Sequence, residues 1–316
     1  MKSIASAPAK IILFGEHFIV YGGKAILCSI NKRITVESEL TKTGQIEIES
    51  SLGKLKISKS DSYKNADLVF RPIIYIAQKM LEKFHSESGI KITVRAEFPS
   101  GVGLGSSSAC CVAAAGSISG LFGNHTREEI LKIAIDAERT IFENTSGADC
   151  TACVYGGILE YSKDGHIRKL ELLPKFDLVV ANSGIIHSTN KVVSMVRQFK
   201  DERQETFSSL CTQEAGLIED ALACLQRNDL TKIGKLMTQN QEFLEKIGVS
   251  NDTLRSMISL TKDVSYGAKI TGAGDGGCII ALADKTNLEK IQSALAKKYE
   301  CFSAKIDTRG LEQGSA

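Results

Sequence analysis

The chain has 316 residues, of which 43% are apolar and 24% charged, a composition typical of a folded globular protein. It carries 39 basic and 37 acidic residues, a balance that argues against nucleic acid or an anionic membrane as partner. No run approaches the roughly 18–20 apolar residues of a membrane-spanning helix. We therefore expect a cytoplasmic protein of two packed domains, and the composition argues against a disordered or fibrous chain.

The nine cysteines are expected to be thiols, because the cytoplasm is reducing. Cys150 and Cys153 form a CxxC pair, a spacing found in zinc and redox sites. The chain has no second CxxC and no histidine at ligand spacing, so a zinc site would lack two ligands. We expect both cysteines to pack in the core.

The first third of the chain is predicted to be rich in β-strands. Alternating or β-branched residues indicate strands over 4–6, 9–14, 25–30, 34–39, 45–50 and 54–58. A helix is predicted over 71–87, with Pro72 in its first turn where no N–H is needed. Another strand is predicted over 90–98.

A glycine-rich passage then leads into a helix of small apolar residues over about 109–122. Thr126 and Glu129 form a capping box that opens a helix to about residue 142. Residues 144–149 are predicted to be a loop, and 158–162 and 167–172 a β-hairpin.

Pro174 is the predicted boundary between domains 1–173 and 174–316. The second domain is predicted to begin with a strand over 178–182, and four helices should follow it, over 191–200, 203–227, 229–247 and 252–261. Strands over 268–271 and 278–283 flank the glycine-rich loop 272–277. Thr286 and Glu289 predict a second capping box and a helix to about 299, then a strand over 302–307 and a loose tail from Gly310.

The glycine-rich passage has the features of a phosphate site. Its glycines let the backbone turn its N–H groups toward a ligand, and the following helix adds its positive N-terminal dipole. It matches neither GxxxxGK[ST], since no lysine follows, nor GxGxxG, since position 106 is serine. The simpler interpretation is a helix N-cap after a flexible turn. The residues expected to bind phosphate are Ser100, Gly101, Val102, Gly103, Leu104, Gly105, Ser106, Ser107 and Ser108.

Phosphoryl transfer also needs a carboxylate on Mg²⁺, a carboxylate facing the attacking hydroxyl, and a cation. Glu138, Asp149 and Lys10 can fill these roles, but spacing alone does not select them among 37 acidic residues. The loop 272–277 either forms a hairpin or brings a second backbone to the phosphates. Asp275 would repel phosphate there, so its side chain should point away.

Three motifs stand in a fixed order along nearly the whole chain. They are Pro-Ala-Lys-Ile-Ile-Leu-Phe-Gly-Glu-His-Phe-Ile-Val-Tyr-Gly-Gly at 8–23, Pro-Ser-Gly-Val-Gly-Leu-Gly-Ser-Ser-Ser-Ala at 99–109, and Lys-Ile-Thr-Gly-Ala-Gly-Asp-Gly-Gly-Cys at 269–278. Together they resemble the small-molecule kinases named for galactose, homoserine, mevalonate and phosphomevalonate. The first motif and the segment Ser-Gly-Ala-Asp at 146–149 are most similar to the mevalonate kinase branch.

The resemblance implies an α+β fold of two domains with the active site in the cleft between them. The N-terminal domain would be ribosomal-protein-S5-domain-2-like and bind ATP, and the C-terminal domain would be ferredoxin-like. It also implies phosphorylation of the 5-hydroxyl of (R)-mevalonate by ATP, a step of isoprenoid biosynthesis, with Mg²⁺ as cofactor. Relatives are often homodimers.

The resemblance also implies a role for each matching residue. ATP would lie along 100–108 and near Gly272 and Gly274, with Mg²⁺ on Glu138 and on Ser107 or Ser106. Asp149 would accept or orient the hydroxyl proton, and Lys10 would stabilise the developing charge. Glu16 and His17 would bind the hydroxyls of mevalonate, and Thr189 would reach the γ-phosphate from the second domain.

Three alternatives remain open at this point. A phosphomevalonate kinase would need extra basic residues at the acceptor pocket, and a mevalonate 3-kinase would differ only in pocket shape. A non-catalytic regulator of this fold would be expected to lack Lys10, Glu138 or Asp149, and all three are present.

Overall fold

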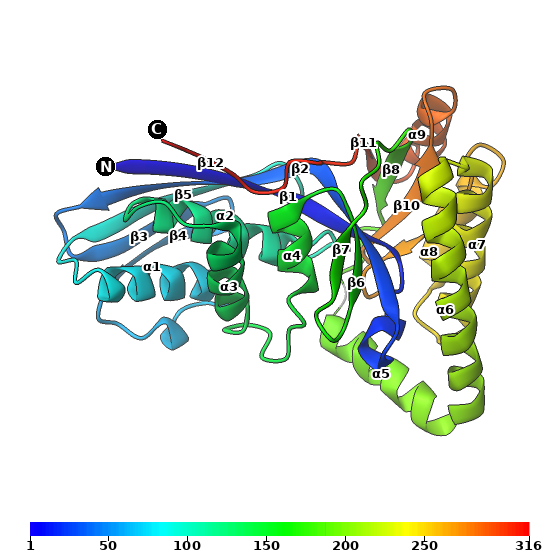
Figure 1. Cartoon of the computed structure of the whole chain (residues 1–316), viewed down its shortest axis with the longest axis horizontal. Coiled ribbons are helices and arrows are strands. Elements are labelled where there is room, and N and C mark those ends of the chain that lie inside the picture. The colour runs from blue at the N-terminus through cyan, green and yellow to red at the C-terminus, as the bar shows by residue number, and fades with distance from the viewer. Residues whose placement is uncertain (187, 316) are drawn as a thin grey trace.

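The computed structural model describes residues 1–186 and 188–315. Figure 1 shows two parts, each built on its own β-sheet, with helices on one side of the larger sheet. One sheet has eight strands and the other has four. The mixed α+β architecture of two parts confirms the predicted fold class. The boundary at 173/174 stays a prediction, although the second sheet begins only at β8 (Asp177–Asn182).

The larger sheet is organised by two long strands, β1 (Lys2–Phe14) and β2 (Lys24–Thr41), which pair antiparallel. Its main order is β12-β1-β2-β5-β3-β4, and the hairpin of β6 and β7 joins the first half of β2. The remaining strands are β3 (Gln45–Ser50), β4 (Gly53–Ser58), β5 (Gly89–Ala96), β6 (Ile158–Ser162) and β7 (Ile167–Lys169).

The prediction of four short strands over 4–14 and 25–39 was wrong in one respect. The chain forms two continuous strands instead, and the β1–β2 register shifts between Pro8 and Ala9. Pro8 has no backbone N–H to donate to the neighbouring strand. It is tolerated at the bulge, where the pairing is already irregular, so it interrupts the alternation of side chains without ending the strand. Strand β1 therefore stays paired with β2 beyond the bulge, and Lys10 is a buried residue within it.

A layer of helices lies on one side of this sheet (Figure 1). They are α1 (Arg71–Lys83), α2 (Ser106–Gly120), α3 (Arg127–Glu138) and α4 (Ala148–Tyr155). Helix α2 is buried on almost all sides and packs on β1 and β2. Small residues permit this, since a Cβ on Gly116 would lie 3.0 Å from the Cβ of Ala5.

Three of these helices differ from expectation at their ends, and one was not predicted. Helix α2 begins at Ser106 rather than near 109, so the three serines are helical. The capping box of Thr126 and Glu129 is present, but α3 ends at Glu138 rather than near 142. Helix α1 ends at Lys83 rather than 87, before His85 with a φ of 47°. The predicted loop 144–149 ends in helix α4, which begins at Ala148.

The smaller sheet has the ferredoxin-like topology. The strands β8, β9 (Ala268–Thr271), β10 (Cys278–Ala283) and β11 (Glu300–Ala304) are arranged in the order β11-β8-β10-β9 and are all antiparallel. Helices lie between β8 and β9 and between β10 and β11, which gives the β-α-β-β-α-β order of this motif. The prediction of a ferredoxin-like second domain is confirmed.

Five helices belong to this part, and their bounds are close to the predicted ones. They are α5 (Thr189–Glu202), α6 (Gln204–Arg227), α7 (Leu230–Lys246), α8 (Asp252–Thr261) and α9 (Leu288–Ala296). The second capping box is absent, because Asn287 is the N-cap of α9 without a side-chain bond. Thr286 instead donates to Asp284 from both its backbone N–H and its hydroxyl, at 2.7 and 2.5 Å.

The C-terminal residues return to the larger sheet, so the prediction of a loose tail was wrong. Strand β12 (Glu312–Ser315) pairs with β1, and both termini lie at the same end of the molecule (Figure 1). The buried guanidinium of Arg33 pairs with Asp307 and donates to the carbonyl of Gly310 at 2.7 Å. These bonds fix residues 305–315, the C-terminal strap, across the junction of the two sheets.

Two 3₁₀ turns complete the described elements, η1 (Phe18–Tyr21) after β1 and η2 (Tyr63–Asn65) before α1. Within residues 1–186 and 188–315, no helix is both long and apolar enough to cross a membrane. Cys150 and Cys153 are completely buried on α4, which confirms that they pack in the core.

Candidate active site

Lys10 and Asp149 form an ion pair where β1 meets α4. The ammonium of Lys10 lies 2.9 Å from a carboxylate oxygen of Asp149. The lysine side chain is 4% exposed and the aspartate 36%. Asp149 occupies the first turn of α4, where the helix dipole favours a negative charge. The pair thus combines a desolvated cation with a carboxylate that solvent or a substrate can reach.

Glu138, the last residue of α3, is buried beside this pair. Its carboxylate accepts hydrogen bonds from the hydroxyls of Ser108 and Thr145, the latter at 2.5 Å. Burial raises the pKa of Glu138, and the charge of Asp149 raises it further. The structure therefore brings together the three charged residues that the sequence singled out.

The predicted phosphate-binding passage 100–108, which we call the phosphate loop, runs directly into α2, and its three serines form the first residues of that helix. Gly101, Gly103 and Gly105 have φ angles of 76°, 86° and 69°, a region that side chains disfavour. A Cβ on Gly105 would lie 2.7 Å from Cγ of Lys10, so the loop packs directly on the lysine stem. The backbone N–H of Lys10 also donates to the carbonyl of Leu104 at 3.0 Å.

The three serines after the loop have different environments. Ser108 is buried and donates to Glu138. The hydroxyl of Ser106 accepts a bond of 3.4 Å from the backbone N–H of Gly101 and closes the loop. Ser107 is half-buried at the start of α2. Its assignment to Mg²⁺ stays a prediction, as do phosphate contacts for Ser100 and Val102.

The glycine-rich loop 272–277 packs against the phosphate loop through close contacts between their backbones. A Cβ on Gly103 would lie 3.2 Å from the carbonyl oxygen of Thr271, and one on Gly272 would lie 3.3 Å from Gly103. Gly274 instead packs on the turn at Val249 between α7 and α8. Asp275 has a φ of 55° and donates its backbone N–H to the carbonyl of Val249.

Glu16 and His17 lie in the sharp turn after β1, and both contact the second domain. Glu16 is completely buried in an ion pair with Lys269 of β9. His17 has a φ of 63°, and its Nε2 lies 2.8 Å from the carbonyl oxygen of Ala273. Burial lowers the pKa of His17, which favours a neutral imidazole that donates from Nε2 and can accept a hydrogen bond at Nδ1.

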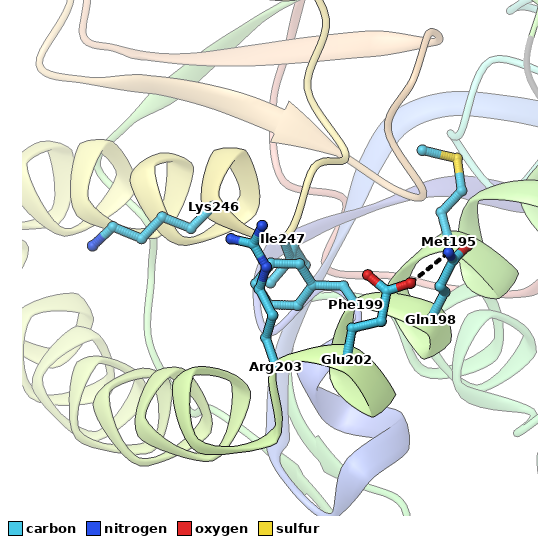
Figure 2. A pocket seen from close by; sticks show the side chains of 7 residues that line it. All are labelled: Met195, Gln198, Phe199, Glu202, Arg203, Lys246 and Ile247. Carbon is cyan, nitrogen blue, oxygen red and sulfur yellow. Dashed lines mark hydrogen bonds between the residues drawn. The ribbon is translucent and has the colours of Figure 1, made fainter.

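Thr189 begins α5 and is exposed. Among the described residues, no hydrogen bond joins it to the other predicted site residues, so its contact with a phosphate stays a prediction. A pocket of about 360 Å³ lies at the elbow of α5 and α6, beside the end of α7. Figure 2 shows its lining, which includes none of the predicted site residues: Met195, Gln198, Phe199, Glu202, Arg203, Lys246 and Ile247.

Sequence reasoning missed four residues that support the site. Thr145 was part of the predicted loop, and Lys269 was noted only within a motif. Glu214 and Asn240 fall inside the predicted helices 203–227 and 229–247, with no motif to mark them. Glu214 did carry a signal, since it falls at the spacing of the buried α6 residues Leu210 and Leu217.

The donor set around Glu138 fits Mg²⁺. The ion prefers oxygen ligands and is usually held by one or two carboxylates together with substrate phosphates. A carboxylate and serine hydroxyls stand at the end of the phosphate loop, as this arrangement requires. Residues 1–186 and 188–315 contain no cluster of three or more acidic, histidine or cysteine side chains that would form a metal cage by itself.

Comparison with known proteins matches both parts of the chain to the same family of kinases. The description "GHMP kinases N terminal domain" matches residues 68–157, and "GHMP kinases C terminal" matches residues 221–301. Mevalonate kinase of Pyrococcus horikoshii is 36% identical in an alignment of 299 positions that covers 89% of this chain and 88% of that protein.

Solved structures agree. The crystal structure of Methanococcus jannaschii mevalonate kinase has a TM-score of 0.85 at 27% identity, over 96% of this chain and 98% of that one. L. major mevalonate kinase in complex with R-mevalonate has a TM-score of 0.82 at 26% identity, over 96% and 95%. The fold, the two glycine-rich loops and the similarity over nearly the whole length agree: this chain belongs to the GHMP kinase family.

Proposed function

We propose that the chain is a mevalonate kinase, which transfers the γ-phosphoryl group of ATP to the 5-hydroxyl of (R)-mevalonate and releases 5-phosphomevalonate and ADP. The observation that carries the proposal is the Lys10–Asp149 pair at 2.9 Å, placed against the phosphate loop at the N-terminus of α2. The choice of mevalonate as the acceptor substrate is supported by archaeal relatives named mevalonate kinase, which are 34–36% identical over most of the chain.

Catalysis would follow from positioning and electrostatics, as in other phosphoryl transfers. ATP would lie along 100–108, with its phosphates on the backbone N–H groups and helix dipole of α2. Asp149 would orient the acceptor hydroxyl and take its proton as the oxygen attacks phosphorus. Lys10 would stabilise the charge that develops on the transferred group, in a buried setting where that interaction is strong.

Mg²⁺ belongs to this proposal, with Glu138 and a serine hydroxyl as its protein ligands. When bound, the ion would neutralise charge on the β- and γ-phosphate oxygens. His17 would accept a hydrogen bond from an acceptor hydroxyl at Nδ1. A cytoplasmic location and a homodimer are parts of the same proposal.

The direct test is ADP release from Mg·ATP with mevalonate, phosphomevalonate, galactose or homoserine as the acceptor. We expect turnover with mevalonate and at most traces with the other three. Turnover with phosphomevalonate instead would contradict the assigned acceptor. ATP binding without turnover of any acceptor would support the non-catalytic regulator.

A further inference from the structure

A buried polar cluster joins the two domains behind the acceptor turn, which we define as residues 15–18. Its members are Glu16 from this turn, Lys269 from β9, Glu214 from α6 and Asn240 from α7. All four are at most 1% exposed. No catalytic step described above uses Lys269, Glu214 or Asn240.

The bonds of the cluster link these elements directly. The ammonium of Lys269 pairs with Glu16 and donates to the carbonyl of Ile270 at 2.8 Å. The amide of Asn240 donates to both carboxylate oxygens of Glu214, at 2.9 and 2.8 Å. The backbone N–H of Gly15 also interacts with the Glu214 carboxylate. Two adjacent residues of the turn are thus held from β9 and α6, and Asn240 of α7 in turn holds Glu214.

The backbone of the turn needs such support. Gly15 and His17 have φ angles of 97° and 63°, and a left-handed histidine persists only where its surroundings enforce it. The third contact from the second domain is the bond of His17 to the carbonyl of Ala273. Removing the contacts of Gly15 and Glu16, just before His17, should therefore release the imidazole from its position.

Charge in the cluster is not balanced if every group is ionised, because two carboxylates face one ammonium. A buried net charge is costly. Oε2 of Glu16 and Oδ1 of Asn240 also have no hydrogen-bond partner among the described residues. Burial, and then the charge of Glu16, raises the pKa of Glu214 to about 7. One proton held on Glu214 balances the cluster.

We propose that Glu16, Lys269 and Glu214 are positioning residues, which clamp the acceptor turn so that His17 faces the acceptor, and that Glu16 acts through this clamp rather than by touching the acceptor. The proposal rests on mevalonate kinase activity for its kinetic readout. It differs from the expectation that Glu16 binds a hydroxyl of mevalonate.

The test begins with Lys269→Met, which keeps an unbranched stem and leaves Glu16 buried without a partner. We expect the KM for mevalonate to rise about 10–100-fold, as for displacement of a binding group by about 1 Å. The KM for ATP and the kcat at saturating mevalonate should stay within about 3-fold. An unchanged KM for mevalonate would overturn the proposal.

The double variant Glu16→Gln/Lys269→Met separates positioning from contact. Replacing both partners of a buried ion pair is often tolerated, whereas removing one is not. We expect the double variant to regain stability to urea relative to Lys269→Met, because no unpaired charge stays buried. Its KM for mevalonate should stay raised about 10–100-fold over the wild type, because the contact that positions the turn is still missing. A further KM increase of about 10-fold or more over Lys269→Met would show that Glu16 contacts the acceptor, and a wild-type KM would show that the contact does not position the turn; either result overturns the clamp.

Asp307→Asn is the matched control, because it breaks a buried ion pair that holds the C-terminal strap instead of the acceptor turn. It should lower the unfolding temperature and leave the KM for mevalonate within about 2-fold. A comparable KM increase in this control would mean that the effect of Lys269→Met is general destabilisation.

Amide hydrogen exchange at residues 15–21, measured by mass spectrometry, reports on the mobility of the turn and does not require that the protein phosphorylate mevalonate. Lys269→Met should speed exchange there at least 10-fold relative to Asp307→Asn. Unchanged exchange overturns the clamp even if mevalonate is turned over. Faster exchange in a protein that does not phosphorylate mevalonate would support the clamp and contradict the proposed function.

Discussion

The unequal exposure of Lys10 and Asp149 suits their proposed roles. A lysine removed from water is attracted strongly to negative charge, because little solvent screens it. The neighbouring carboxylate keeps one face open, so a hydroxyl can approach it. Glu138 lies behind them and is held by Ser108 and Thr145, which leaves the three charged groups with fixed positions before any substrate binds.

Replacing Asp149 by asparagine tests the proton acceptor. The variant keeps the size of the side chain and removes its basicity, so kcat should fall about 10²–10⁴-fold, the range for loss of a general base. ATP binding by calorimetry should change little. Asp136→Asn on α3 is the control, and a kcat of Asp149→Asn as high as that of the control would exclude Asp149 as the base.

Glu138→Gln tests the metal ligand. The amide has lost the negative charge that Mg²⁺ prefers, so the Mg²⁺ concentration needed for half-maximal activity should rise about 10-fold or more. Glu128→Gln, on the exposed side of the same helix, should leave it unchanged. Superimposable Mg²⁺ titrations of the two variants would remove Glu138 from the metal site.

For individual residues, the sequence could identify candidates for the active site but could not show which side chains contact one another. Lys10, Glu138 and Asp149 were singled out through the family motifs, since spacing cannot choose among 37 acidic residues. The clamp residue Glu214 was missed because a glutamate on a long helix is usually solvated. Only the tertiary fold brings it to Gly15, which is 199 positions earlier in the sequence.

Among the elements, the phosphate loop depends on β1 as much as on α2. Gly105 has no room for a side chain because Lys10 passes beneath it. Gly105→Ala should therefore displace the lysine and lower kcat roughly 10–100-fold. Gly44→Ala is the matched control, since Gly44 has a similar φ of 64° with open space around it.

Both glycine variants should lose about 1 kcal/mol of stability from the disfavoured backbone alone. Unfolding by urea measures this shared cost. Activity assays then isolate the contact with Lys10. Equal kcat values for the two variants would mean that the close packing of the loop on Lys10 does not matter for catalysis.

Elements with strong local signals were predicted well. The bounds of α8, β9 and β10 agree with prediction because caps or glycines flank an apolar pattern. Helix α4 was missed, since the polar residues and Gly147 before it are typical of a loop and its stability comes from packing on α2 and β1. Strand β12 has no apolar alternation and is held by backbone pairing with β1.

For the whole molecule, the clamp couples stability to pH through Glu214. Folding raises its pKa from an ordinary value near 4.5 to about 7. The folded state therefore binds this proton more tightly, and the free energy of unfolding falls as pH rises between these values. The groups around it are Glu16, Lys269, Asn240 and the nearby Cys211.

Glu214→Gln should remove this pH dependence. Between pH 5 and pH 8, the wild type should lose about 2.5 kcal/mol of stability relative to the variant. Urea unfolding at both pH values measures the difference, in which the contributions of other titrating groups cancel. Parallel pH curves would contradict a Glu214 that holds a proton in the folded protein.

The central claim is the transfer of a phosphoryl group to the 5-hydroxyl of mevalonate. Phosphorus NMR of the product mixture, recorded without proton decoupling, tests it most directly. A 5-phosphate has two protons on the adjacent carbon, so its signal should be a triplet that grows as ATP is converted to ADP. A product signal without this splitting would place the phosphate on the tertiary 3-hydroxyl and contradict the account, as would unchanged ATP in the presence of mevalonate and Mg²⁺.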